Sequence, residues 1–207
     1  VLLYADDTLI LAESEVELKK ALRAAEDYCK NAKLYINEKK SKVVVFSAGK
    51  IRKIPRFCIN GKQIEVVPNF IYLGIVFNYN GSFKPAIAHN VLKGHRAMFK
   101  LLSRAKDLDL SIETTFELFD KVVGPVVTYG AELWGFENLD TIELFHRKFL
   151  KLVLGVRKTI PNCMVYGETG RTNISCLIKT KMMTFLLHLE QLPDSRYSKI
   201  FLQLIKI

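Results

Sequence analysis

The chain has 207 residues, which is enough for one or two compact units. Its hydrophobic content of 49% is sufficient to form a core. Its 31 Lys and Arg residues outnumber 21 Asp and Glu, and the net charge of +10 favours a polyanionic partner such as nucleic acid or an anionic membrane surface. No apolar run reaches the ~20 residues that span a bilayer, and four widely spaced cysteines without a CxxC pair indicate reduced thiols inside a cell.

The first predicted element is a hairpin with acidic residues at its tip. Apolar runs at 1–4 and 8–11 flank Asp6 and Asp7, and Asp tolerates turn geometry. Carboxylates are the usual ligands of Mg²⁺, and two such ions ~3.5–4 Å apart stabilise both the attacking and the leaving oxygen in phosphoryl transfer. An Asp-Asp pair is also commonplace in turns, so the alternative is a hairpin without a catalytic role. Because Val1 already lies in an apolar strand, we expect a fragment.

Mixed α and β structure is predicted up to residue 82. Ser14 and Glu17 form a candidate capping box, and apolar residues then recur at helical spacing as far as Ala32. Asn60-Gly61 predicts a tight hairpin turn. Strands are predicted at residues 42–47, 57–59, 63–66 and 69–77.

Beyond Gly81 the hydrophobic period is helical. Gly124-Pro125 is expected to end or kink the second of these helices, and Gly155 to stop the third. Ser111 and Asn138 are the expected caps of the second and third helices. The helices are predicted at 87–105, 111–123, 138–154, 173–191 and 195–207. The inward face of the third is predicted to consist of Ile142, Phe145, Phe149 and Leu152, and Phe116 and Phe119 are likewise assigned to the core rather than to base stacking.

Three blocks resemble a known family, in the family's order. Leu3-Tyr4-Ala5-Asp6-Asp7 is similar to the catalytic Tyr-x-Asp-Asp hairpin of reverse transcriptases. Residues 34–42 resemble the next block, and Tyr72-Leu73-Gly74 resembles a later hairpin that grips the primer end. Downstream, residues 126–134 and 145–171 are similar to segments of LINE-like, non-LTR retrotransposon enzymes that viral reverse transcriptases lack.

The resemblance implies an RNA-directed DNA polymerase with an α+β fold. Residues 1–82 would be the C-terminal half of the palm, an antiparallel sheet plus a helix, and residues 83–207 an all-helical, thumb-like region. The implied partners are an RNA template, a DNA primer and deoxynucleoside triphosphates, without a membrane. The implied protein is intracellular, synthesised in the cytoplasm and active in the nucleus.

The resemblance also assigns site residues. Asp6 and Asp7 would hold Mg²⁺ in a two-metal site. Lys40 is the expected acid toward the departing pyrophosphate, although Lys39 and Lys42 are close enough to leave this choice open. Residues expected to contact the primer or nucleic acid are Tyr4, Tyr72, Leu73, Gly74, Lys39 and Lys42.

The family needs two further parts that precede the catalytic hairpin. One is another aspartate on an upstream strand, and the other is the fingers, which bind the incoming nucleotide. Because the hairpin starts at residue 3, we expect the metal site to be incomplete and these 207 residues to be inactive alone. The alternatives are a non-catalytic nucleic-acid-binding remnant and the relic of a decayed element.

Two basic groups are candidates for phosphate contact, with a solvated surface as the alternative reading for each. The first consists of Lys39, Lys40, Lys42, Lys50, Arg52, Lys53 and Arg56, and the second of Lys93, His95, Arg96, Lys100, Arg104 and Lys106. The metal-type residues His146, Cys163, Cys176 and His188 lack the short paired spacing of zinc modules. We therefore expect His146 and His188 to serve in ordinary packing.

Overall fold

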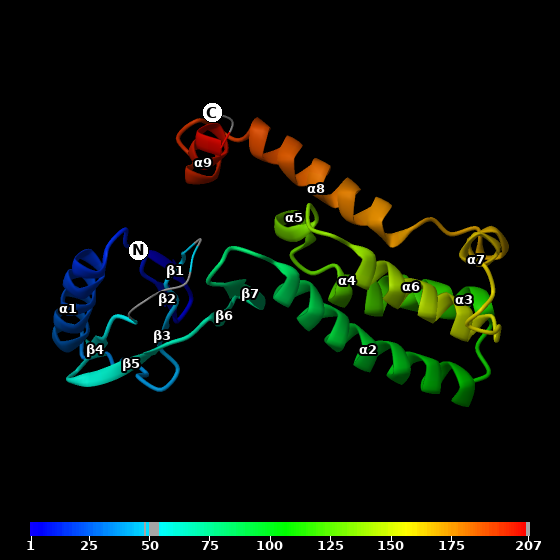
Figure 1. The fold of residues 1–207 in the computed structure, drawn as a ribbon, viewed down its shortest axis with the longest axis horizontal. Coiled ribbons are helices and arrows are strands. Elements are labelled where there is room, and N and C mark those ends of the chain that lie inside the picture. The colour runs from blue at the N-terminus through cyan, green and yellow to red at the C-terminus, as the bar shows by residue number, and fades with distance from the viewer. Residues whose placement is uncertain (48, 50–53, 206–207) are drawn as a thin grey trace. The chain divides into compact units, whose positions relative to one another are not determined.

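A computed structural model describes residues 1–47, 49 and 54–205 (Figure 1). The chain divides into two compact units, Val1–Ser82 and Phe83–Ile207. The fold is mixed α+β with small sheets, which agrees with the predicted class. Three members of the first basic group, Lys50, Arg52 and Lys53, lie outside the described residues.

The described residues of the first unit form one helix and three small sheets. Its elements are β1 (Leu2–Tyr4), β2 (Asp7–Leu9), α1 (Glu15–Asn31), β3 (Lys42–Val43), β4 (Phe57–Ile59), β5 (Lys62–Val66), β6 (Asn69–Tyr72) and β7 (Ile75–Asn78). The pairs β1–β2 and β6–β7 are antiparallel, whereas the third sheet has the order β3-β5-β4 with β3 parallel to β5. The expected single antiparallel sheet is therefore replaced by separate small sheets, one of which contains a parallel pair.

Local sequence signals set the ends of α1 and the turn between β4 and β5. Ser14 Oγ accepts a hydrogen bond from the Glu17 backbone N–H at 3.2 Å, which confirms the predicted cap. The Glu17 carboxylate accepts from the Glu13 N–H at 2.8 Å, one residue earlier than in a standard capping box. Asn60 and Gly61 have φ of 50° and 74°, and these values confirm the predicted tight turn.

Two strand predictions in the first unit are wrong in extent. Residues 69–77 form a hairpin rather than one strand, because Leu73 and Gly74 have φ of 47° and 81° and reverse the chain. The strand predicted at 42–47 pairs only at Lys42 and Val43. Beyond Val43 the ladder stops, since β5 ends at Val66 and Ser47 bonds instead to the carbonyl of Tyr79.

A small apolar core joins α1 to the β3-β5-β4 sheet. Its buried members are Leu22, Val43, Phe57, Ile59 and Ile64, and Ile10, Leu18, Ile36, Val45 and Val66 pack against them. Helix α1 contacts β4 (Figure 1), and the Glu26 carboxylate accepts from the Asn60 N–H at 2.6 Å. The core therefore holds both the end of the β1–β2 hairpin, through Ile10, and the segment before β3, through Ile36.

The second unit is helical. Its elements are α2 (Lys84–Asp107), α3 (Ile112–Leu118), a π-helical turn η1 (Phe119–Val123), α4 (Gly124–Val127), α5 (Ala131–Trp134), α6 (Asp140–Val153), α7 (Asn162–Thr169), α8 (Ile174–Gln191) and α9 (Tyr197–Ile205). The short helices α5 and α7 were not predicted. Within the described part of the chain, every helix is too short or too polar to cross a bilayer.

The helical path does not end at Gly124-Pro125, contrary to one of the two expectations. It continues from α3 through η1 into α4, and the Gly124 N–H donates to the carbonyl of Phe119 five residues earlier. Pro125 then falls in the first turn of α4, where a missing N–H costs nothing. Ser111 caps α3 as predicted, since its Oγ accepts from the Thr114 N–H at 3.1 Å.

Aromatic side chains form the centre of the second unit. Phe119 and Phe149 stack with ring centroids 3.9 Å apart, and Phe116 and Phe145 are also buried, as predicted. Leu152 was predicted to point inward but is 45% exposed. The fully buried Leu150 takes the inward position in the last turn of α6, because the helical period places Leu152 on another face.

The ends of α6 differ in how well they were predicted. The Asp140 N–H donates to Asn138 Oδ1 at 2.8 Å, but the N-cap position belongs to Leu139, so the predicted cap is displaced by one residue. Gly155 follows the helix with φ of 64°, which confirms the predicted stop.

Candidate active site

The β1–β2 hairpin presents two adjacent carboxylates at its tip. Tyr4 pairs with Asp7, so Ala5 and Asp6 form a two-residue loop. Ala5 has φ of 52°, a left-handed conformation that costs a residue with a Cβ roughly 1–2 kcal/mol. Asp6 and Asp7 are both exposed, and neither side chain has an ion pair within the described ranges. Both carboxylates are therefore available as ligands.

The hairpin is attached to the rest of the unit at its C-terminal end. Ile10, directly after β2, packs against the core of the first unit. The apolar residues of β1 are on the surface instead, with Leu2, Leu3 and Tyr4 exposed by 51%, 73% and 64%. Tyr4, the predicted neighbour of the primer end, therefore has its ring accessible beside the two acids.

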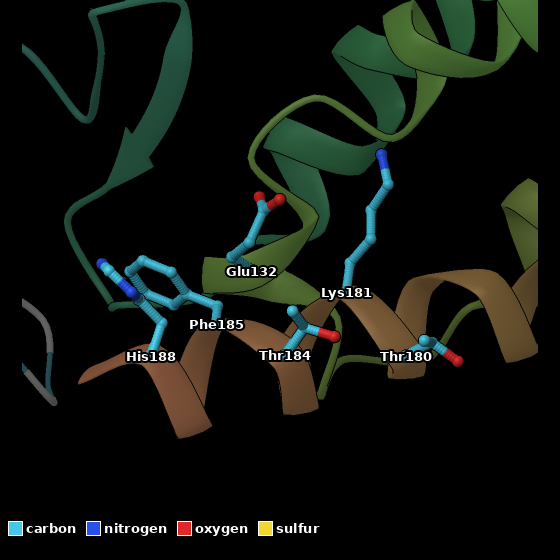
Figure 2. A pocket seen from close by; sticks show the side chains of 6 residues that line it. All are labelled: Glu132, Thr180, Lys181, Thr184, Phe185 and His188. Carbon is cyan, nitrogen blue, oxygen red and sulfur yellow. The ribbon is translucent and has the colours of Figure 1, made fainter. Parts of the chain in front are cut away.

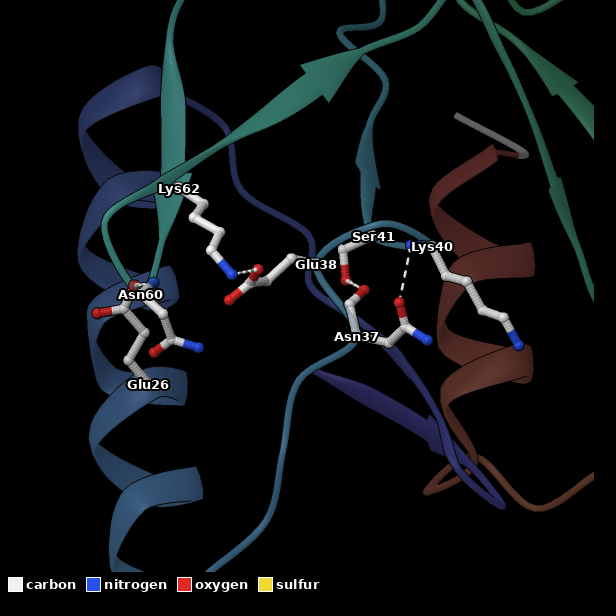
Figure 3. Close-up of polar contacts among 7 residues, drawn as sticks. All are labelled: Glu26, Asn37, Glu38, Lys40, Ser41, Asn60 and Lys62. Carbon is white, nitrogen blue, oxygen red and sulfur yellow. Dashed lines mark hydrogen bonds and ion pairs between the residues drawn. The ribbon is translucent and has the colours of Figure 1, made fainter.

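A turn stabilised by Asn37 presents Lys40. Asn37 Oδ1 accepts from the Lys40 N–H at 3.2 Å, and Ser41 Oγ donates to the Asn37 carbonyl at 2.9 Å. Ile36 anchors the start of this turn in the core. In Figure 3 the Lys40 side chain extends away from the turn, and its ammonium has no ion pair in the described part of the chain.

The two neighbouring lysines differ in their surroundings. Lys42 Nζ lies 2.6 Å from Glu65 Oε2, across the parallel β3–β5 pair. Lys39 is exposed. Beside them, Lys62 pairs with Glu38 at 2.6 Å (Figure 3), and the hydrogen bond from Lys62 lowers the pKa of the Glu38 carboxyl. Sequence reasoning did not identify Glu65, because only the strand register brings it opposite Lys42.

The segment predicted to grip the primer is the β6–β7 turn. Tyr72 pairs with Ile75, and Leu73 and Gly74 form the loop. Leu73 is 37% exposed and has φ of 47°, which is unusual for a leucine. Strained backbone of this kind is often found at binding sites.

The hairpin contains some, but not all, of the ligands that a Mg²⁺ site needs. Two exposed carboxylates are suitable hard oxygen ligands for Mg²⁺. No group of three or more His, Cys, Asp or Glu side chains suited to a metal ion occurs among the residues that the structure describes. Asp6 and Asp7 can therefore provide part of a metal site, and the rest of the ligand set has to come from another segment or from substrate phosphates.

The metal-type residues of the second unit do not form a zinc site within the described residues. His146 is buried in the core as predicted, and burial lowers its pKa to about 4. Beside it, the buried Glu143 accepts hydrogen bonds from the Tyr166 hydroxyl and, at 3.2 Å, from the Ser175 N–H. His188 was expected to pack but is exposed.

A pocket of about 350 Å³ lies between α5 and α8 (Figure 2). It is lined by Glu132, Thr180, Lys181, Thr184, Phe185 and His188. Lys181 Nζ donates to Thr128 Oγ1 at 2.7 Å, so this ammonium contributes to packing. None of the residues predicted for catalysis or primer contact lines the pocket.

Comparisons with known proteins bear on both units. Residues 1–77 match the family described as "Reverse transcriptase (RNA-dependent DNA polymerase)". Over 159 residues the chain is 26% identical to a transposon-derived protein of Caenorhabditis elegans. The aligned region covers 75% of this chain and 57% of that protein. The chain thus spans little more than half the length of this relative. No solved structure matches the chain. Together the two matches support a reverse transcriptase-like element.

Proposed function

We propose that the chain is the C-terminal palm and thumb-like part of an RNA-directed DNA polymerase from a LINE-like, non-LTR retrotransposon. The observation that carries the proposal is the β1–β2 hairpin, which presents Asp6 and Asp7 exposed, and without an ion pair among the described residues, within the stretch that matches the family. The LINE-like assignment rests on the resemblance of residues 126–134 and 145–171. In this proposal residues 1–82 belong to the palm and residues 83–207 to the thumb-like region.

The chain's own residues have separate roles in the proposed reaction. Asp6 is a direct ligand of Mg²⁺ and Asp7 its acidic neighbour, while Tyr4 lies near the primer end. Bound Mg²⁺ supplies Lewis-acid stabilisation of the oxygens that attack and leave. Because these residues contribute two of the three acids that the resemblance implies, the 207 residues have negligible polymerase activity on their own.

Lys40 is the proposed proton donor to the departing pyrophosphate. The Lys40 backbone is held by a hydrogen bond to Asn37, and its ammonium has no ion pair in the part of the chain that the structure describes, whereas the Lys42 ammonium pairs with Glu65. This difference favours Lys40 over Lys42 as the acid. Lys39, in the same turn as Lys40, would contact a phosphate. In the β6–β7 turn, Tyr72, Leu73 and Gly74 would contact the primer.

A second candidate function is nucleic-acid binding without catalysis, and it is favoured by a basic stripe on α2. The stripe consists of His89, Lys93, Arg96, Lys100 and Arg104, which recur at helical spacing. Burial, and then the charges of Lys93 and Arg96, lower the pKa of His89. In the first proposal the same stripe tracks the phosphates of a template–primer duplex in the nucleus.

Paramagnetic Mn²⁺ tests the metal-ligand assignment on these 207 residues. At low Mn²⁺, the backbone NMR signals of residues around Asp6 and Asp7 should broaden before those of other acidic residues. The Asp6→Asn variant should lose this broadening, while Asp27→Asn on α1 should retain it. Broadening that is unaffected by Asp6→Asn would remove Asp6 from the metal site.

Primer extension by the assembled enzyme separates the two candidate functions, whereas salt dependence measures the binding that both share. Binding through four cations of the α2 stripe predicts a slope of log K against log salt of about −4 for a duplex. Under the binding-only function, affinity and slope survive Asp6→Ala and no extension occurs in any context. Under the polymerase proposal, binding also survives, but extension by the assembled enzyme depends on Asp6.

A further inference from the structure

An exposed aromatic ring lies beside the contact between α2 and α6. Phe99 on α2 is 51% exposed, whereas the rings of Phe116, Phe119 and Phe149, which contact one another, are buried. The His95 ring lies nearly parallel to it, with centroids 6.2 Å apart and an interplanar angle of 19°. From α6, Lys148 Nζ lies 5.1 Å from the Phe99 centroid. These three residues, His95, Phe99 and Lys148, are named the Phe99 platform.

The inner side of the platform is fixed by the core. His95 meets the buried Phe145 ring edge-on, with centroids 4.9 Å apart. Burial, followed by the charge of Lys148, lowers the pKa of His95. The platform thus has an inner ring that packs on the core and an outer ring open to solvent.

The platform lies in a surface of uncompensated positive charge. The sequence of α2 from residue 84 to 106 contains no Asp or Glu. Arg96 and Lys100 lie next to Phe99 on the same helix and are exposed. Neither they nor Lys148 takes part in an ion pair in the described part of the chain. An exposed ring among free cations has the composition of a single-strand nucleic-acid site, where bases stack on aromatics and phosphates meet Lys and Arg.

We propose that the Phe99 platform stacks an unpaired base of single-stranded RNA or DNA, with Arg96, Lys100 and Lys148 on the adjoining phosphates. The inference rests on the proposed nucleic-acid function and adds to it a site for an unpaired strand. Lys148 leaves the face of Phe99 when the base binds, because an exposed cation–π contact is weaker than base–aromatic stacking. The displaced ammonium then pairs with a phosphate.

Fluorescence anisotropy with short oligoadenylates tests the proposal on the 207-residue chain. The probes are labelled single strands of RNA and of DNA and a blunt duplex of equal length, each at low and high salt. The Phe99→Leu variant keeps an apolar side chain but loses the ring, and should weaken single-strand binding about tenfold. Its duplex affinity and salt slope should not change. A larger loss for RNA than for DNA identifies the template strand as the occupant, and the reverse identifies the DNA strand.

Two further variants serve as controls, one that retains an aromatic ring at position 99 and one at another exposed position of α2. Phe99→Trp should retain single-strand affinity, and the fluorescence of the new indole should change when a base stacks on it. The native Trp134 is fully buried, so its own emission should not respond to the bound strand. Leu92→Ala, another exposed apolar position on α2, should leave binding unaltered. A thermal melt of Phe99→Leu close to that of the parent chain establishes that folding is intact.

Three results would overturn the proposal. Unchanged single-strand affinity in Phe99→Leu, with intact salt-dependent binding by the parent chain, removes the platform and leaves the nucleic-acid function standing. No binding of any probe by the parent chain removes both. If Phe99→Leu abolishes self-association in sedimentation without altering strand binding, the platform is a protein contact instead.

Discussion

The Nζ atom of Lys42 lies 2.6 Å from Oε2 of Glu65, and the two residues are direct partners in the parallel pairing of β3 with β5. Two residues earlier, the Lys40 ammonium extends from a turn that Asn37 stabilises (Figure 3). The structure therefore distinguishes two lysines that look equivalent in the sequence. Lys42 contributes to the sheet, and the ammonium of Lys40 has no ion pair among the residues that the structure describes.

This difference predicts opposite effects for two matched substitutions. In a polymerase that joins this chain to the upstream half, Lys40→Met should lower primer extension about 100-fold or more, as expected for loss of a general acid. Lys42→Met should leave extension near the parent rate and cost only about 0–1 kcal/mol of stability, because the pair is partly exposed. Single-nucleotide extension and urea unfolding measure the two effects. A larger activity loss for Lys42→Met would contradict the assignment.

Leu73 should show opposite effects on stability and function. Its φ of 47° is unfavourable for leucine, and Asn tolerates this region, as Asn60 does in the β4–β5 turn. We expect Leu73→Asn to stabilise the chain by about 0.5–1 kcal/mol in urea unfolding. In the assembled polymerase the same variant should extend primers more slowly, because the proposed primer contact loses its apolar side chain. Faster extension by Leu73→Asn would argue against primer contact here.

Gly94 allows α2 to approach α4 closely. A Cβ at this position would lie 2.3 Å from Val127 Cγ2 and 3.2 Å from Phe145 Cζ. Gly94→Ala should therefore destabilise the second unit by about 2 kcal/mol. The control is Gly167→Ala in α7, where a Cβ has open space and should stabilise by about 0.5–1 kcal/mol. Thermal melts of both variants measure this, and equal melting temperatures would contradict the packing described.

His146 should make the second unit less stable in acid. Burial lowers its folded pKa to about 4 from 6.5, so below pH 6.5 the unfolded chain binds a proton that the folded chain excludes. Stability should fall as the pH drops from 6.5 to 4, by up to about 3 kcal/mol in total, and this contribution should level off below pH 4. His146→Phe keeps a ring beside Phe119 and removes the titration. Urea unfolding across this range should show a shallower slope for the variant, and identical slopes would refute the assignment.

Features set by local chemistry could be predicted from the sequence. Ser14 caps α1 and Asn60-Gly61 turns the chain, because a side-chain oxygen and a left-handed turn need only neighbouring residues. The run of apolar residues from 69 to 77 predicted one strand and did not reveal the turn at Leu73-Gly74, because an apolar residue occupies a turn position there. Gly124-Pro125 was predicted to end or kink the helix, and the helical path instead continues through a π-helical turn into α4.

The hairpin that carries the two candidate acids was predictable from the sequence, whereas the contacts around the candidate site were not. The tip position of Asp6 and Asp7 follows from the flanking apolar runs. The Lys42–Glu65 pair joins residues 23 positions apart. It depends on the register between β3 and β5, which could not be predicted from the residue types alone. The exposure of Phe99 and of His188 likewise depends on how helices pack, because helical spacing alone gives the same pattern for a core residue.

RNA-templated primer extension with Mg²⁺ shows whether the Asp6-Asp7 hairpin is catalytic. The protein joins this chain to the upstream polymerase segment, and is compared with its Asp6→Ala and Asp27→Ala variants and with the 207 residues alone. We expect extension by the parent and by Asp27→Ala, and none by Asp6→Ala or by the 207 residues alone. Extension that persists in Asp6→Ala would contradict the catalytic assignment of the hairpin.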